Sequence, residues 1–156
     1  MFPLPGTVIH GMRGPNSLQL EHVIGNGAFG VVFLAHDMQS DEHYAVKFPQ
    51  VTSLSDSPEL DAFKNELRAA TMVKHDNVVR VLHVEPEFTH VPPYLVMEYI
   101  EGGTLRDVIE SRKSAGGHIE PELLLSISRQ IVDGISAINA SMLHRDLKPD
   151  NILLSE

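Results

Sequence analysis

The amino-acid sequence predicts an α+β protein in which an antiparallel sheet with one helix comes first and further helices follow. Three observations predict this class. Apolar and polar residues alternate in short runs before residue 100, as in strands that bury one face. After Pro121, apolar residues recur with the period of a helix. Glycine pairs lie between these two parts and favour breaks in regular structure.

The first part is expected to form an antiparallel meander. Residues 1–16 contain three prolines and three glycines and are expected to be an irregular leader. Strands are expected at residues 18–24, 31–35, 44–48, 78–84 and 94–99. Short turns join the first three, which favours antiparallel pairing.

Helix start signals lie in both parts. Ser57-Pro58 combines an N-cap residue with proline at the first helical position. Gly102-Gly103 is expected to interrupt the chain as a hinge, after which Thr104 and Asp107 have the spacing of a capping box. Pro121 is expected to start a long helix, with an apolar face formed by Leu124, Ile127, Ile131, Ile135 and Ile138.

Composition narrows the class of protein. The chain has 156 residues, of which 42% are hydrophobic, as expected for one soluble domain. Its net charge of −9, without a basic block, argues against nucleic acid or an anionic membrane as a partner. The absence of cysteine excludes disulfides and thiolate chemistry. With no apolar run of about 18 residues for a membrane span, a cytoplasmic location is expected.

A glycine-rich segment follows the first expected strand: Gly25, Asn26, Gly27, Ala28, Phe29 and Gly30. In a dinucleotide-binding unit such a loop leads into a helix, but here the β-forming run 31–34 follows it. The loop is therefore expected to lie between two strands, where backbone without Cβ can lie against phosphates. Phe29 could shield those phosphates from water. A turn made only for packing is the plainer alternative.

Two charged residues have a pattern that favours a buried pair. Period two places Ala45 and Lys47 on one face of a strand. Glu66 lies between Phe63 and Leu67 on the apolar side of its helix, where a carboxylate is costly unless it is paired. Each could instead be solvated at the surface, which is the usual place of lysine.

The octapeptide 144–151, His-Arg-Asp-Leu-Lys-Pro-Asp-Asn, holds an acid, a base and an amide at fixed offsets. As a whole, the octapeptide is too specific a pattern to be explained as a charged surface turn. It closely resembles the catalytic loop of protein kinases, and the glycine loop and Lys47 strand match the same family. The chain thus resembles serine/threonine protein kinases over most of residues 18–156. Its opening, Pro5-Gly6-Thr7-Val8-Ile9, resembles the leaders of bacterial members of this family. Lys148 favours the serine/threonine type over the tyrosine type.

The resemblance implies roles for the charged residues. Asp146 accepts the proton of the substrate hydroxyl, and Lys148 reaches the γ-phosphoryl oxygens. Asn151 ligates Mg²⁺. Lys47, paired with Glu66, holds the α- and β-phosphates of ATP.

The resemblance also implies an adenine pocket and a division of the chain. The apolar pocket residues are Ile24, Val32, Ala45, Met97 and Leu153, and the backbone of Glu98 and Ile100 faces the adenine edge. The implied fold is protein-kinase-like, with a leader at 1–16, a nucleotide-binding lobe at 17–100, and the hinge with a partial helical lobe at 101–156. The implied partners are ATP, Mg²⁺ and a protein carrying serine or threonine.

The family's Asp-Phe-Gly motif does not occur after Asn151, so the chain is expected to be a truncated kinase with little activity alone. A non-catalytic, pseudokinase-like module that binds nucleotide or a partner is the alternative. A small-molecule phosphotransferase of kinase-like fold is a third hypothesis, which Arg145 disfavours because such enzymes more often carry glycine there.

Overall fold

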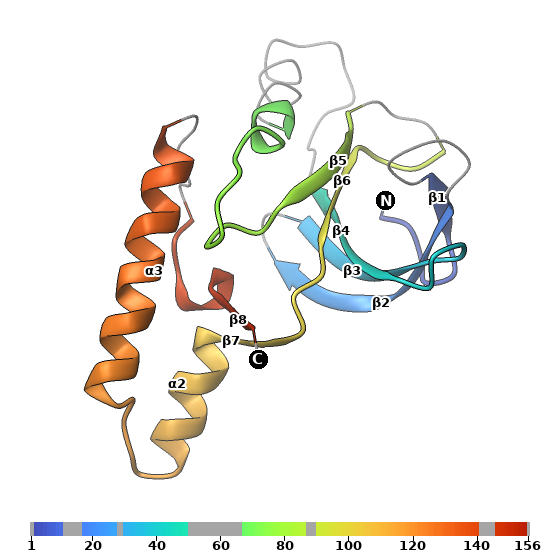
Figure 1. Cartoon of the computed structure of the whole chain (residues 1–156). Coiled ribbons are helices and arrows are strands. Elements are labelled where there is room, and N and C mark those ends of the chain that lie inside the picture. Colours follow the sequence, from blue (N-terminus) through green and yellow to red (C-terminus); the bar gives the residue numbers. More distant parts are fainter. Residues whose placement is uncertain are drawn as a thin grey trace. The chain divides into compact units, whose positions relative to one another are not determined.

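The structure is a computed structural model that describes residues 2–10, 17–27, 30–49, 67–86, 90–140 and 146–155 (Figure 1). The chain divides into two compact units. Unit 1 contains Met1–Met72 and Arg80–Tyr99, and unit 2 contains Val73–Val79 and Ile100–Glu156. Each unit is described by itself.

Unit 1 contains a six-stranded antiparallel sheet that curls, in the order β1-β2-β3-β4-β6-β5 (Figure 1). Its strands are β1 (Val8–His10), β2 (Ser17–Gly27), β3 (Gly30–Asp37), β4 (His43–Pro49), β5 (Val81–Glu85) and β6 (Tyr94–Glu98). The predicted meander of the first three expected strands is confirmed as β2, β3 and β4. The fourth begins later than expected, at Val81.

The prediction that residues 1–16 are irregular was wrong for Val8–His10, which form β1. Ile9 pairs with Leu18 and is almost completely buried, and Leu20 N donates to Thr7 O over 2.9 Å. The β-branched residues in this segment suit a strand. Prolines and glycines on both sides obscured that signal.

One face of the sheet is the apolar core. Phe33 and Phe48 meet edge to face with ring centroids 5.9 Å apart, and Phe48 lies 5.5 Å from the Tyr94 ring. The buried core residues are Ile9, Leu18, Leu20, Val31, Phe33, Ala35, Val46, Phe48, Val91, Tyr94 and Val96. Most of the helix expected to begin at Ser57 falls on residues 57–66, which lie outside the described residues; residues 67–70 are helical.

Unit 2 combines two helices with a small two-stranded sheet. Its elements are β7 (Gly102–Thr104), α2 (Leu105–Ser114), α3 (Pro121–Asn139), the 3₁₀ turn η1 (Pro149–Asn151) and β8 (Leu153–Ser155). The predicted capping box of Thr104 and Asp107 is confirmed, as is the start of a helix at Pro121.

The prediction that Gly102-Gly103 interrupts regular structure was wrong, because these residues pair with β8. Gly102 has φ +136°, and a Cβ on it would lie 2.1 Å from Leu154 O. Only glycine allows the two strands to approach this closely. The partner strand lies about fifty residues further along the chain, so the local sequence could not reveal it.

Helix α3 contacts segment 73–79 of its own unit. A Cβ on Gly134 would lie 2.6 Å from Asn77 O, and Asn77 Nδ2 donates to Gln130 Oε1 over 3.0 Å. On the predicted apolar face Ile127 is buried, whereas Leu124 is 48% exposed. Within the described ranges, no helix is both long and apolar enough to cross a membrane.

Candidate active site

Four candidate nucleotide-contacting residues of unit 1, which are Val32, Ala45, Lys47 and Met97, share the face of the sheet opposite the core. Cross-strand pairing joins Lys47 to Val32 on one side and to Leu95 on the other. Ala45 pairs with Met97 in the next row. Since directly paired residues point to the same side of a sheet, these five side chains form one continuous surface. Ala45 is buried, while Val32, Lys47 and Met97 are half-buried.

The glycine loop lies between two strands. Gly27 ends β2 and pairs with Gly30, the first residue of β3, so a strand lies on each side of the glycine loop, as predicted. Gly30 has φ +123°, and a Cβ on it would lie 2.1 Å from Phe48 O. Asn26 and Gly27 are exposed. Ala28 and Phe29 lie outside the described residues.

Ile24 lies next to Gly25 at an irregularity of β2. The register between β2 and β3 shifts between Val23 and Gly25, which leaves Ile24 without a paired residue across the sheet. Ile24 is 42% exposed, an unusual environment for an isoleucine in a strand. A Cβ on Gly25 would lie 3.6 Å from Val32, so the backbone here lies against that side chain.

The expected partner of Lys47 cannot be placed. Glu66 lies outside the described residues, so the ion pair between Lys47 and Glu66 stays a prediction.

The end of β6 is fixed through Glu98. Its backbone N donates to Arg80 O over 3.0 Å, and its Oε1 accepts from Arg80 N over 2.7 Å. Two bonds to one residue hold the segment that reaches Tyr99, the last residue of unit 1. Ile100 begins the second part of unit 2.

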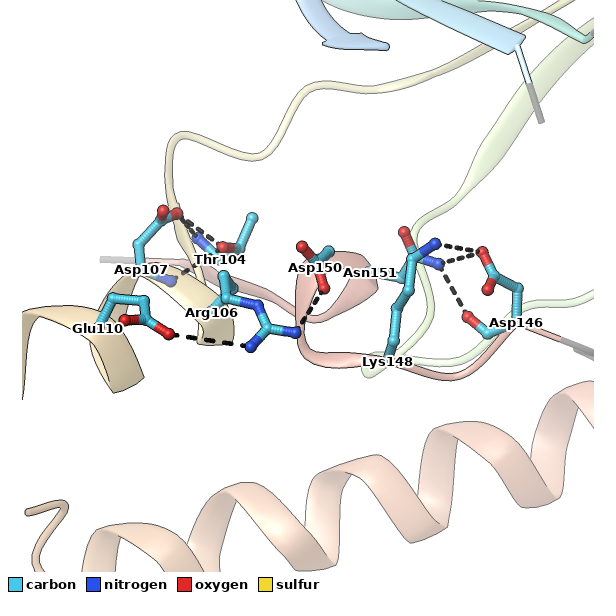
Figure 2. A network of polar contacts seen from close by, with 8 residues as sticks. All are labelled: Thr104, Arg106, Asp107, Glu110, Asp146, Lys148, Asp150 and Asn151. Atoms are coloured by element: carbon cyan, nitrogen blue, oxygen red, sulfur yellow. Dashed lines mark hydrogen bonds and ion pairs between the residues drawn. The ribbon is translucent and has the colours of Figure 1, made fainter. Parts of the chain in front are cut away.

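In unit 2 the catalytic-loop residues meet around one carboxylate (Figure 2). Lys148 Nζ lies 3.0 Å from Asp146 Oδ2. Asn151 Nδ2 donates to the same oxygen over 2.8 Å and to Asp146 O over 2.8 Å. The structure thus brings together the predicted base, lysine and amide. His144 and Arg145 lie outside the described residues.

The contacts of Asn151 determine which end of its amide points away from Asp146. Both acceptors are oxygens, so the nitrogen must face them and the amide oxygen must point elsewhere. An amide oxygen is a suitable ligand for Mg²⁺. The described residues contain no cluster of three or more histidine, cysteine or acidic side chains suited to a metal.

Unit 2 also holds a charged pair that the sequence interpretation missed. Arg106 Nη2 donates to Asp150 Oδ2 over 3.1 Å, and Arg106 Nη1 lies 4.0 Å from Glu110 Oε1 (Figure 2). The hydrogen bond from Arg106 lowers the pKa of Asp150 below its ordinary value. The available signal was a cation in the first turn of a helix, where the helix dipole disfavours positive charge.

Leu153 lies at the beginning of β8. It pairs with Thr104, and Leu105 N donates to Ile152 O over 2.8 Å. Leu153 is 44% exposed. The chain just after the catalytic loop is therefore bound by backbone pairing to β7 and to the start of α2.

Comparisons with known proteins agree on one family. A family model described as the protein kinase domain matches residues 18–156. The serine/threonine-protein kinase PrkC of Bacillus subtilis is 34% identical over 145 residues, covering 92% of this chain and 22% of that protein. The serine/threonine-protein kinase PknA of Corynebacterium glutamicum is 32% identical over 142 residues, covering 88% and 29%. These matches confirm the resemblance to bacterial serine/threonine kinases.

A solved structure shows the same fold. The PknI kinase domain of Mycobacterium tuberculosis superposes with a TM-score of 0.76 at 20% identity, covering 98% of this chain and 57% of that one. The predicted protein-kinase-like fold is thereby confirmed. The chain spans less than a third of the length of the two curated relatives named above.

Proposed function

Because this chain belongs to the protein kinase family, we propose that it carries the ATP-binding lobe and the catalytic loop of a serine/threonine protein kinase. The observation that carries the proposal is the cluster in which Lys148 and Asn151 both contact the Asp146 carboxylate. A carboxylate held in one orientation by two donors suits a proton acceptor, because proton transfer requires a fixed position within hydrogen-bond reach.

In the proposed reaction, Asp146 accepts the proton of a serine or threonine hydroxyl. The hydroxyl oxygen forms a bond to the γ-phosphorus of ATP, and the bond from that phosphorus to the β–γ bridging oxygen breaks, which releases ADP. Little covalent chemistry falls to the protein, so positioning and charge neutralisation dominate catalysis. Lys148, 3.0 Å from Asp146, supplies a positive charge next to the reacting groups.

Asn151 is the proposed ligand of Mg²⁺ in this chain. Its amide nitrogen is engaged by Asp146, so its oxygen is directed to another side. When bound with ATP, Mg²⁺ neutralises negative charge on the phosphates. Asn151 thus has two proposed tasks, because one amide orients the base and also presents a metal ligand.

The shared sheet face is the proposed surface for the nucleotide in unit 1. Val32, Ala45 and Met97 supply apolar contact area for adenine, and Ile24 adds an exposed apolar side chain. Lys47, in the row next to Ala45, holds the α- and β-phosphates. Gly25, Asn26, Gly27, Ala28, Phe29 and Gly30 form the proposed phosphate loop. By the family resemblance alone, Glu98, Ile100 and Leu153 are further proposed nucleotide-contacting residues, and Glu66 is the proposed partner of Lys47.

The proposal is tested with variants of the natural polypeptide that carries this chain. Asp146→Asn should lower the rate of phosphoryl transfer by about 10²–10⁴-fold, the usual contribution of a positioned proton acceptor. ATP affinity should change little, because this carboxylate acts on the hydroxyl. Asp133→Asn, an exposed aspartate on α3, is the matched control and should keep full activity.

A second variant separates this proposal from the alternatives. Lys47→Met should abolish transfer by disturbing the phosphates, while circular dichroism checks that the sheet remains folded. ATP binding by the wild-type protein without transfer to any substrate would favour a non-catalytic module. Transfer to a small molecule but not to protein would favour the third hypothesis, and near-normal turnover of Asp146→Asn would refute the role of this residue.

A further inference from the structure

The pair formed by Arg106 and Asp150 lies beside the catalytic cluster but belongs to no role proposed above. Asp150 directly precedes Asn151 in the 3₁₀ turn η1. Arg106 belongs to the first turn of α2, forty-four positions earlier in the chain. The ion pair therefore joins the helix to the turn that carries the Asn151 amide (Figure 2).

The position of Arg106 in its helix is unfavourable by itself. A cation near the N-terminus of a helix is destabilising, because the first turn exposes backbone N–H groups and partial positive charge. The other basic residues of α2, Arg112 and Lys113, lie in the last turn, where positive charge is favourable. The carboxylates of Asp150 and Glu110 offset the cost for Arg106.

The turn η1 has little support of its own. Its backbone bonds are Asn151 N to Lys148 O over 2.9 Å and Ile152 N to Pro149 O over 3.4 Å. Short 3₁₀ turns have poorer hydrogen-bond geometry than α-helices, so contacts from outside determine their orientation. Backbone pairing holds the following strand β8, and the bond from Leu105 N to Ile152 O holds the residue after the turn. The Arg106 contact adds a side-chain link from α2 to the turn itself.

We propose that Arg106 is a positioning residue for the catalytic loop. By binding Asp150 it fixes η1 against α2 and keeps the Asn151 amide on the Asp146 carboxylate. The chemical benefit rests on the proposed kinase function, whereas the alignment of Asn151 is a property of this chain and can be measured without activity.

The kinetic test uses the natural polypeptide that carries this chain. Both side chains are about half exposed, and exposed ion pairs contribute modestly. Arg106→Gln should therefore lower kcat by about two- to fivefold, with KM for ATP unchanged. Asp150→Asn should do the same, and the double variant should be no worse than either single one, because both changes remove one interaction. Arg112→Gln is the matched control and should leave kcat unchanged.

The dependence of kcat on ionic strength distinguishes loss of the ion pair from loss of folding. Screening weakens an exposed ion pair, so the ratio of wild-type to Arg106→Gln kcat should fall toward one as ionic strength rises. A ratio that stays constant with salt, or single effects that add in the double variant, would overturn the positioning role.

The alignment itself is tested by NMR on the same polypeptide as the kinetic test. Arg106→Gln should shift the side-chain amide resonances of Asn151 and speed their exchange with water, while Arg112→Gln should not. Unchanged backbone signals of β3 confirm that the variant is folded. Unchanged Asn151 resonances would refute the inference even if the wild-type protein transfers phosphate. Absence of transfer by the wild type would instead count against the kinase function and leave the NMR result valid.

Discussion

The two units hold their candidate residues in different ways. In unit 1, Lys47 and Ala45 lie on a sheet whose other face is a continuous apolar core, in which eleven of the described residues are buried. In unit 2, Asp146 and Asn151 are held by hydrogen bonds and ion pairs among exposed and half-buried side chains, and few of the apolar residues that the structure describes in this unit are buried. Apolar packing therefore supports the sheet face that carries Lys47, while electrostatic contacts support the segment around Asp146. The stability of unit 1 should therefore respond to changes in side-chain volume, and the stability of unit 2 to changes in charge, salt and pH.

The largest effect should come from emptying the core of unit 1. Phe48→Ala removes a fully buried ring that contacts Phe33 and Tyr94, and should lower the free energy of unfolding by about 3–5 kcal/mol. Chemical denaturation monitored by circular dichroism gives this value. Met38→Ala, at an exposed position, should change it by less than about 0.5 kcal/mol. Equal losses in both variants would contradict the packing argument.

In unit 2 the position that should be most sensitive to substitution is Gly102, where two backbone segments lie close together, rather than a buried side chain. Gly102→Ala places a Cβ 2.1 Å from Leu154 O at φ +136°, so β7 and β8 must separate. Gly116→Ala is the matched control, because its φ is also positive at +69° but no atom lies within 4 Å of the added Cβ. Gly116→Ala should lower the free energy of unfolding by about 1–2 kcal/mol through backbone strain alone, and Gly102→Ala should lower it by more. Hydrogen exchange of the Leu105 amide reports the separation directly.

High pH should act on unit 1 through Tyr94. Burial raises the pKa of Tyr94 to about 12 from 10.0. The unfolded state therefore releases this proton first, so stability is full below pH 10 and is lost as the pH rises toward 12. Tyr94→Phe should flatten the fall in unfolding free energy between pH 9 and 11.5. Tyr99→Phe, at an exposed position, should keep the wild-type slope. Equal slopes in all three proteins would show that Tyr94 does not cause the loss.

Low pH should act on unit 2 through the capping box. Hydrogen bonds from the Thr104 side chain and backbone lower the pKa of Asp107 below its ordinary 3.8. The stabilisation is therefore present above that value and is lost as the pH falls through the lowered pKa. Thr104→Ala removes the cap and should cost about 1 kcal/mol at neutral pH. The amides of α2 should exchange faster in this variant, and their acid sensitivity should decrease. An acid response equal to that of the wild type would exclude the capping box as its source.

Local patterns predicted the elements that local forces determine. Strand alternation at Leu18 and Leu20, the Thr104 cap and the start of α3 at Pro121 each depend on neighbours within a few residues. The pairing of Gly102 with β8 depends on residues far along the chain, so no local pattern could reveal it. The ion pair of Arg106 with a residue of the catalytic loop was missed for the same reason.

The catalytic residues illustrate the same limit. The octapeptide singled out Asp146, Lys148 and Asn151 as candidate site residues, because their offsets are specific, and the catalytic roles of these residues stay predictions. It did not predict that Asn151 would contact both the backbone and the side chain of Asp146, since that depends on how η1 turns.

The contact of Asn77 with Gln130 and Gly134 has a consequence for the order in which the chain folds during translation. Asn77 is synthesised among the strands of unit 1, yet its partner Gln130 follows 53 residues later. At about 5–20 residues per second, this is a delay of roughly 3–10 s. Strands β5 and β6 are both complete by Glu98, so the sheet can close during this interval. We therefore expect the sheet of unit 1 to fold first during translation, and segment 73–79 to gain its contacts with α3 only after that helix has been synthesised.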